Sequence, residues 1–122
     1  MKTIICGLVA TLAILSGCAA TVTEAGYYWG DYSQTLYKYT VDPSEVTLAN
    51  HVQELENIIE ASREKGLRVP PGVHAELGYI KARQGNDAAA TAHYETEMSL
   101  YPESRLFLER LTVETKKGSE KS

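Results

Sequence analysis

The chain has 122 residues, a formal net charge of −4 and two cysteines, Cys6 and Cys18. This length is enough for one domain with a modest hydrophobic core. The acidic balance and the lack of a basic cluster exclude the electrostatic footprint of a nucleic-acid-binding protein, so we expect no nucleic acid among its partners.

An apolar run near the start of the chain has the properties of an export signal. Lys2 places a positive charge ahead of residues 3–15, a run that is shorter than the roughly 20 apolar residues that a membrane-spanning helix needs. We therefore predict a signal peptide over residues 1–17, which takes no part in the fold. An ordinary secretory signal followed by a chance cysteine remains an alternative to a lipoprotein signal.

The end of this signal, Leu15-Ser16-Gly17-Cys18, resembles the lipobox of bacterial lipoproteins. The resemblance implies that the thiol of Cys18 carries diacylglycerol, that the chain is cut just before it, and that the new amino group is acylated, for example with palmitate. Ala19 stands where an aspartate would imply retention in the inner membrane, so the expected location is the outer membrane, facing the periplasm. The acyl chains on Cys18 would then provide the membrane attachment, because two or more chains give stable anchoring.

A short tether and an aromatic segment follow. Residues 18–26 are small and lack periodicity, which predicts a lipidated tether. The alternation of Tyr37 and Tyr39 with polar neighbours is typical of a strand, whereas steps of three and four residues through the segment are typical of a helix. We favour a short helix over 31–40, with the carboxylate of Asp31 accepting the N–H groups at its start.

Four further helices are predicted downstream. The first begins after Asp42-Pro43, with Asp42 as its cap, and runs to Lys65, where Gly66 ends it. Its apolar stripe consists of Leu48, Val52, Leu55, Ile58 and Ile59. The other three, bounded by glycine or proline and with Asp87 as the cap of the second, cover residues 72–84, 88–100 and 103–114. The helical domain thus spans residues 27–115, and residues 116–122 are predicted to be a flexible tail.

Residues 71–102 resemble one tetratricopeptide repeat, a helix–turn–helix unit that recurs every 34 residues. The matching positions are Leu77-Gly78, Gly85, Ala90 and Tyr94, whereas His74 and Glu97 depart from the pattern. Gly78 and Ala90 are expected to be small where two helices cross, with Tyr94 filling the space beside them. We predict an all-α fold of about five helices in tetratricopeptide-like hairpins, with residues 103–114 as a capping helix.

Short motifs link most of the chain to a known family. These motifs are Tyr28-Trp29-Gly30-Asp31-Tyr32, Leu36-Tyr37, Val69-Pro70-Pro71-Gly72, Ala75-Glu76-Leu77-Gly78-Tyr79 and Tyr101-Pro102-Glu103-Ser104. Together they are similar to a family of small bacterial lipoproteins known as domain of unknown function 4810, over residues 27–111. The resemblance implies an outer-membrane lipoprotein without an established activity. Members are often encoded beside lipoproteins similar to the curli secretion pore protein, which implies a partner in an envelope secretion or surface-assembly system.

No catalytic constellation stands out in the chain. His51, His74 and His93 fall on three predicted helices, and no spacing places two of them on one face, so we interpret them as structural. With Cys6 removed and Cys18 blocked, no thiol is free for a disulfide, a metal or catalysis. We therefore predict no catalytic residue, no metal site and no cofactor, and the protein is not expected to be an enzyme.

Two carboxylates are candidates for polar contacts. Glu97 occupies a position that is small and buried in the tetratricopeptide pattern, and a buried charge without a partner is very costly. We expect Arg83 or a tyrosine hydroxyl to be that partner. Glu76 is the second candidate, and a structural contact is favoured over a general acid–base pair of Glu76 and Glu97.

The aromatic segment offers the best candidates for binding a partner protein, because tyrosine and tryptophan combine a large apolar area with a polar tip. These candidates are Tyr28, Trp29, Tyr32, Tyr37 and Tyr39. Two other interpretations remain: half of these residues complete the core against the stripe of the 42–65 helix, or the rings form a belt near the lipid headgroups.

The expected function is that of a periplasmic interaction module in an envelope secretion or surface-assembly complex, anchored in the outer membrane by the lipid on Cys18. A curli-pore-like lipoprotein is a possible partner. The alternatives are a small-ligand binder or enzyme that uses Glu76 and Glu97 with tyrosines, and a purely structural envelope lipoprotein.

Overall fold

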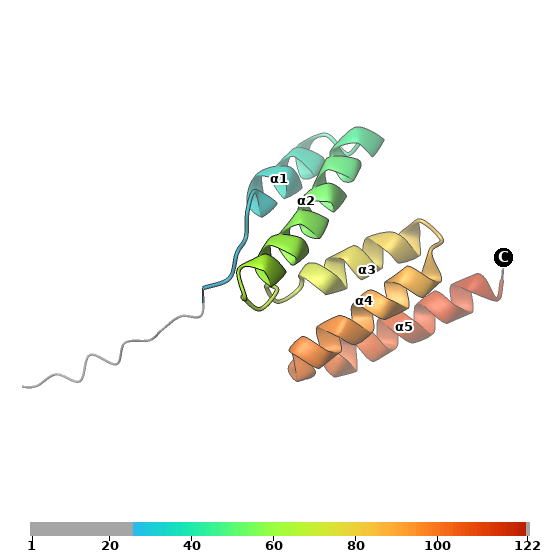
Figure 1. Ribbon diagram of the computed structural model, residues 1–122. Coiled ribbons are helices and arrows are strands. Elements are labelled where there is room, and N and C mark those ends of the chain that lie inside the picture. The colour runs from blue at the N-terminus through green and yellow to red at the C-terminus, as the bar shows by residue number, and fades with distance from the viewer. Residues whose placement is uncertain (1–25, 122) are drawn as a thin grey trace, which may run out of the picture.

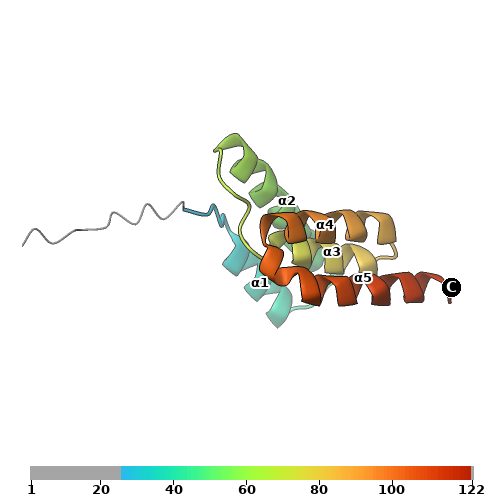
Figure 2. The ribbon, with the colours of Figure 1, turned by 90° about the horizontal axis from the view of Figure 1, so that it is seen from below.

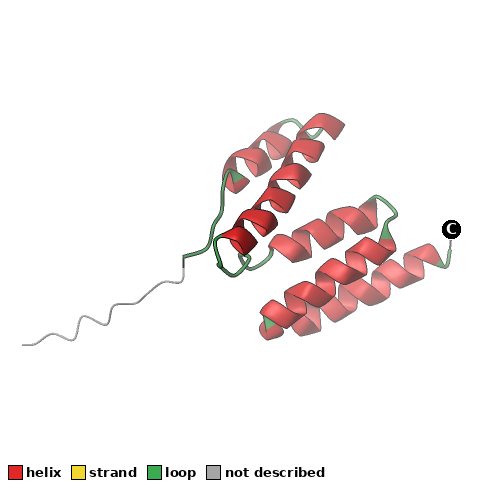
Figure 3. Ribbon diagram, in the orientation of Figure 1, coloured by secondary structure: helices red, strands yellow, loops and turns green. Residues whose placement is uncertain are grey.

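The computed structural model describes residues 26–121, and all regular structure in that part of the chain is helical (Figure 1, Figure 3). The helices are α1 (Tyr32–Val41), α2 (Glu45–Glu64), α3 (Val73–Arg83), α4 (Asp87–Leu100) and α5 (Arg105–Ser119), with a 3₁₀ turn, η1 (Pro102–Ser104), before α5. The prediction of an all-α fold with about five helices is confirmed. The aromatic segment forms the predicted helix and not a strand.

The helices are arranged around α3. It packs against α2 on one side and against α4 and α5 on the other, so that an α1–α2 hairpin is followed by a layer of three helices (Figure 1, Figure 2). The described chain enters near the α2–α3 connection, and the end of α5 lies at the opposite end of the molecule (Figure 1).

The core has two parts, and α3 contributes to both. The first part consists of Leu55, Ile58, Val73 and Leu77, from α2 and α3. The second part consists of Ala90, Tyr94 and Leu108, from α4 and α5. Ala75 and Ala82 of α3 pack against the second part. Because α3 is apolar on two sides, it joins the α1–α2 hairpin to the rest of the domain.

A close crossing of α3 and α4 depends on Gly78, as the sequence predicted. A Cβ atom built on Gly78 would lie 2.7 Å from Cε1 of Tyr94 and 3.1 Å from the carbonyl oxygen of Ala90. The ring of Tyr94 is fully buried against this glycine. The absence of a side chain at Gly78 therefore lets Tyr94 fill the space between the two helices.

The prediction that Asp42 caps α2 is wrong. α1 continues as far as Val41, and the N–H of Asp42 donates to the carbonyl of Lys38, so Asp42 ends α1 instead. Ser44 caps α2: its Oγ accepts from the N–H of Thr47, and Oγ1 of Thr47 accepts from the N–H of Ser44. Threonine takes the place that glutamate or glutamine usually occupies in such a capping box.

Two other predicted caps also differ from the structure. The carboxylate of Asp31 makes no capping hydrogen bond at the start of α1; the N–H of Asp31 donates to Oε1 of Glu54 on α2 at 2.9 Å. At the start of α4, Asn86 is the cap in place of Asp87, and its Oδ1 accepts from the N–H of Ala89. In both cases the oxygen that accepts comes from a residue other than the predicted aspartate: Glu54 on another helix at α1, and the adjacent Asn86 at α4.

The last helix is longer than predicted. The sequence placed its end near residue 114 and a flexible tail over residues 116–122, but α5 continues to Ser119. The helix begins with the 3₁₀ turn at Pro102, where proline fits the first position. Leu108 and Leu111 of α5 cover the second part of the core.

Candidate functional site

The five aromatic residues predicted to bind a partner divide into two groups. Tyr28 and Tyr32 pack against the first part of the core, in line with the interpretation that half of the segment completes the core. Trp29 and Tyr37 remain 41% and 68% exposed. Tyr39 is half-buried and lines a hollow between α1 and α3. The solvent-accessible part of the segment is therefore Trp29, Tyr37 and one edge of Tyr39.

A line of rings connects the exposed end of the segment to the interior. The ring centroids of Tyr27 and Trp29 are 6.5 Å apart, those of Trp29 and Tyr32 are 5.3 Å apart, and those of Tyr32 and His51 are 5.5 Å apart. Edge-on and tilted contacts at these separations are the favoured arrangements of aromatic pairs. The exposed Trp29 is thus held in place by its neighbours.

Glu76 is the centre of a polar network that joins three helices. Its Oε2 accepts from the hydroxyl of Tyr32 on α1 at 2.7 Å, and its Oε1 lies 2.8 Å from Nε2 of His51 on α2. The other ring nitrogen of His51, Nδ1, lies 2.8 Å from Oγ1 of Thr35. Because the carboxylate of Glu76 can only accept, Nε2 of His51 carries a proton.

The network changes the acidity of Tyr32. Burial raises the pKa of Tyr32 to about 12, and the hydrogen bond to the Glu76 carboxylate adds to the effect. His51 is fully buried. Its two ring nitrogens are both satisfied, as a buried polar group requires. The sequence identified Glu76 as a polar contact, but it did not predict the partners.

A hollow of about 480 Å³ lies between α1 and α3 above this network. It is lined by Leu36, Tyr39, Leu48, His51, Glu76, Tyr79, Ile80, Arg83 and Gln84. Apolar and aromatic side chains form most of its wall, and Glu76 with His51 provides a polar patch. This combination of an apolar wall with a few polar groups is typical of binding sites.

Glu97 has a different partner from the one predicted. It is 2% exposed, and its Oε1 accepts from the N–H of Gly72 at 2.7 Å while its Oε2 accepts from the N–H of Ala75 at 3.3 Å. The prediction that Arg83 or a tyrosine hydroxyl would pair with Glu97 is therefore wrong. Gly72 precedes α3 and has no side chain to cap it, so the free N–H groups of the helix satisfy the carboxylate, helped by the helix dipole. Glu97 does not line the hollow that contains Glu76.

Sequence reasoning missed a contact between two histidines. His74 on α3 and His93 on α4 lie with their Nδ1 atoms 3.0 Å apart. The two residues fall on different predicted helices, and a spacing rule tests only residues on one helix. The predicted pairing of α3 with α4 was the available signal.

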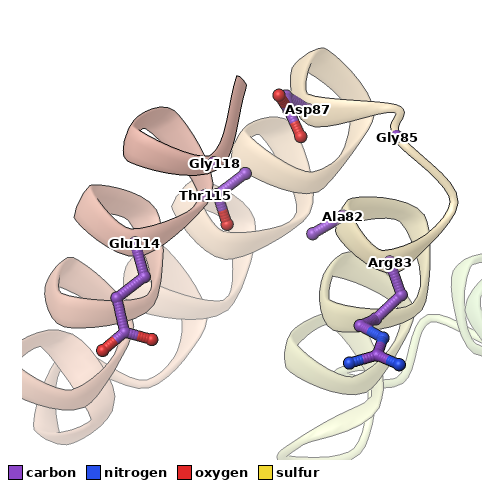
Figure 4. A pocket seen from close by; sticks show the side chains of 7 residues that line it. All are labelled: Ala82, Arg83, Gly85, Asp87, Glu114, Thr115 and Gly118. Atoms are coloured by element: carbon purple, nitrogen blue, oxygen red, sulfur yellow. The ribbon is translucent and has the colours of Figure 1, made fainter. Parts of the chain in front are cut away.

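A second hollow, of about 440 Å³, lies where the α3–α4 turn meets the end of α5 (Figure 4). Small residues, Ala82, Gly85 and Gly118, leave the space open, and Figure 4 shows the side chains of Arg83, Asp87 and Glu114 around it. The sequence did not predict this hollow because it ended the last helix too early to reach the turn.

Within residues 26–121 no helix has the length and the apolar character needed to cross a bilayer. The same residues contain no cluster of three or more histidine, cysteine, aspartate or glutamate side chains suited to a metal ion. The predicted lipidation site, Cys18, lies outside the described residues.

The family model described as "Domain of unknown function (DUF4810)" matches residues 27–111 of the chain. No curated protein and no solved structure matches.

Proposed function

Since the chain belongs to the DUF4810 family of domains of unknown function, we propose that it is an outer-membrane lipoprotein whose helical domain binds a partner protein in the periplasm. The partner is a component of an envelope secretion or surface-assembly complex. A lipoprotein similar to the curli secretion pore protein is the first candidate.

The exposure of Trp29 and Tyr37 is the observation that supports this role. Large aromatic side chains are enriched among the residues that contribute most to protein–protein binding. At 41% and 68% exposure these two rings present apolar area to solvent on the same segment. A purely structural lipoprotein would be expected to bury this segment completely, so an interaction role is favoured.

The helix arrangement supports the same role. The α3–α4 pair, with Gly78 and Ala90 at the crossing and Tyr94 beside it, has the features expected of a tetratricopeptide-like hairpin. Stacked helical hairpins of this kind form extended surfaces that bind other proteins. The α1–α2 hairpin and α5 would be the neighbouring hairpin and the cap.

Site-specific photo-crosslinking in living cells tests the partner. We expect a photoreactive amino acid at position 37 or 29 to crosslink to one envelope protein. The same amino acid at position 95, where Glu95 is exposed on α4, is the matched control. Identical products from positions 37 and 95, or no envelope protein from either aromatic position, would contradict the proposal.

The lipid anchor needs a separate test. The Cys18→Ser variant cannot form the thioether, so we expect it to leave the membrane fraction and to migrate differently from the wild-type protein on gels. Cys6→Ser, which changes the other cysteine of the signal, is the control. Unchanged fractionation of Cys18→Ser would show that the protein is not a lipoprotein, whatever the crosslinking result.

Binding of a small molecule in the hollow between α1 and α3 is the second candidate function. Its volume of about 480 Å³ falls in the usual range for ligand pockets, and Glu76 and His51 supply polar groups. A fragment screen monitored by NMR tests this function. Shifts at Tyr79 and Ile80 that disappear in Tyr39→Ala would support it, and shifts at neither residue would exclude it.

A further inference from the structure

His74 and His93 point at each other across the interface of α3 and α4. The two Nδ1 atoms are 3.0 Å apart, the ring centroids are 5.3 Å apart, and the ring planes differ by 34°. The centroid separation is close to the largest that this nitrogen–nitrogen distance allows. The two Nδ1 atoms therefore lie almost on the line that joins the ring centres. An ion on this line would be coordinated by one nitrogen from each side, in a linear arrangement.

We propose that His74 and His93 bind a soft monovalent metal ion, Cu(I) or Ag(I), through their Nδ1 atoms in linear two-coordinate geometry. Linear coordination by two nitrogen donors is a preferred arrangement of these d¹⁰ ions. Metal–imidazole bonds of about 2 Å would place the two nitrogens about 4 Å apart. The rings must therefore separate by about 1 Å along a line that they already share.

The number of available donors favours a monovalent ion. Zn²⁺ and the other divalent transition metals usually take four or more ligands. Within residues 26–121 no third histidine, cysteine or carboxylate completes such a set. On α4, the buried Glu97 uses both oxygens to accept from the N–H groups of Gly72 and Ala75. Two ligands are enough for an ion such as Cu(I) or Ag(I), which is stable with only two.

The local charge also favours a monovalent ion over a divalent one. The pKa of His93 is lowered by burial and then by the positive charge of Lys81, while Glu56 opposes this effect. Nζ of Lys81 lies 3.3 Å from Oε1 of Glu56, which offsets part of the positive charge beside His93. Two neutral imidazoles add no negative charge, and a single positive charge is therefore easier to accommodate than a double one.

In the hydrogen-bonded pair one Nδ1 carries a proton and the other accepts it. Binding an ion through both Nδ1 atoms requires the donor ring to lose this proton from Nδ1 and to carry one at Nε2 instead. His74 is 7% exposed, whereas His93 is half-buried. An ion can therefore approach from the side of His93, whose ring is the one with room to move outward.

Competition with a chromogenic chelator tests the site. The full chain, with Cys6→Ser and Cys18→Ser in every sample to remove competing thiols, is titrated with Cu(I) and bicinchoninate without oxygen. We expect the chain to withdraw one equivalent of Cu(I), and His74→Gln and His93→Gln to weaken its affinity by more than about tenfold. Glu95→Gln, an exposed change two residues from His93, is the control and should bind as the parent does.

X-ray absorption on the Cu(I)-loaded parent gives a result that does not depend on variants folding. Two nitrogen scatterers in a linear site are expected. Failure to compete with the chelator, equal affinity in His74→Gln, or a sulfur scatterer from a methionine would each overturn the proposal. In those cases the pair is joined only by an N–H···N hydrogen bond.

Discussion

Glu97 shows how one buried carboxylate can organise the start of a neighbouring helix. It belongs to α4, but its oxygens accept from the N–H groups of Gly72 and Ala75 at the first turn of α3. α3 has no side-chain cap of its own. The charge of Glu97 is therefore balanced by N–H groups and by the positive end of a helix dipole, not by a cation.

Glu97→Ala is expected to lower the free energy of unfolding by about 1–3 kcal/mol, because two N–H groups lose a charged acceptor. Glu97→Gln keeps one acceptor oxygen and should lose less. Urea denaturation followed by circular dichroism at neutral pH measures both changes. Glu95→Ala, at an exposed position two residues away, is the control and should stay within about 0.5 kcal/mol of the parent. A loss in Glu97→Ala no larger than in this control would rule out the capping role.

The hydroxyl of Tyr32 makes the free energy of unfolding depend on pH in the alkaline range. Folding raises its pKa from 10.0 to about 12. Between these two pH values the folded state keeps a proton that the unfolded state has released. Stability contributed by Tyr32 is therefore complete below pH 10 and is lost as pH rises towards 12. Urea midpoints across the window should fall less steeply in Tyr32→Phe than in the parent. Tyr37→Phe, at an exposed ring, should follow the parent, and a parallel fall in all three proteins would contradict the assignment.

At the scale of elements, helix positions were easier to predict than the contacts at their ends. Each of the five helices was anticipated, because apolar spacing and the glycines and prolines between helices are local signals. The caps at Asp31, Asp42 and Asp87 were wrong because several polar residues compete near each start. The competitors Ser44 and Asn86 are adjacent in sequence, but Glu54 lies on another helix, which no local pattern reveals.

The α3–α4 pair gives a test at this scale. Gly78→Ala is expected to destabilise the fold by about 1–3 kcal/mol, because the new methyl group would lie 2.7 Å from Tyr94 and 3.1 Å from the backbone of Ala90. Gly118→Ala is the matched change in α5, where a Cβ would meet nothing within 4 Å. It should leave stability unchanged or raise it slightly through helix propensity. Thermal unfolding measures both changes. Equal melting temperatures for Gly78→Ala and Gly118→Ala would contradict the close crossing of α3 and α4.

At the scale of the whole molecule, α3 connects two cores that would otherwise be independent. Leu77 belongs to the first part, while Ala75 and Ala82 on the same helix pack against the second. This arrangement decides which of the five aromatic residues are covered, since Tyr28 and Tyr32 pack against the part of the core that α2 and α3 form. The composition of the segment predicted an interface or a core, but it could not divide the residues between them.

Hydrogen exchange should reveal the shared role of α3. Leu77→Ala is expected to reduce protection in both α2 and α4, because it removes a buried side chain from the helix that joins them. Leu108→Ala should reduce protection mainly in α4 and α5, where its contacts lie. Mass spectrometry of exchanged peptides measures the difference. Loss confined to α2 and α3 in Leu77→Ala would show that the two parts of the core unfold separately.

Burial raises the pKa of Tyr101, and its contact with the hydroxyl of Tyr27 adds to the effect, so Tyr27 at the start of the described chain lies beside the end of α4. Tyr27, at that corner, is nine residues from Cys18, and nine extended residues reach at most about 32 Å. An acyl group on Cys18 would therefore keep this corner of the domain close to the bilayer. It would leave the far end of α5 as the part of the molecule that stands highest above the membrane surface.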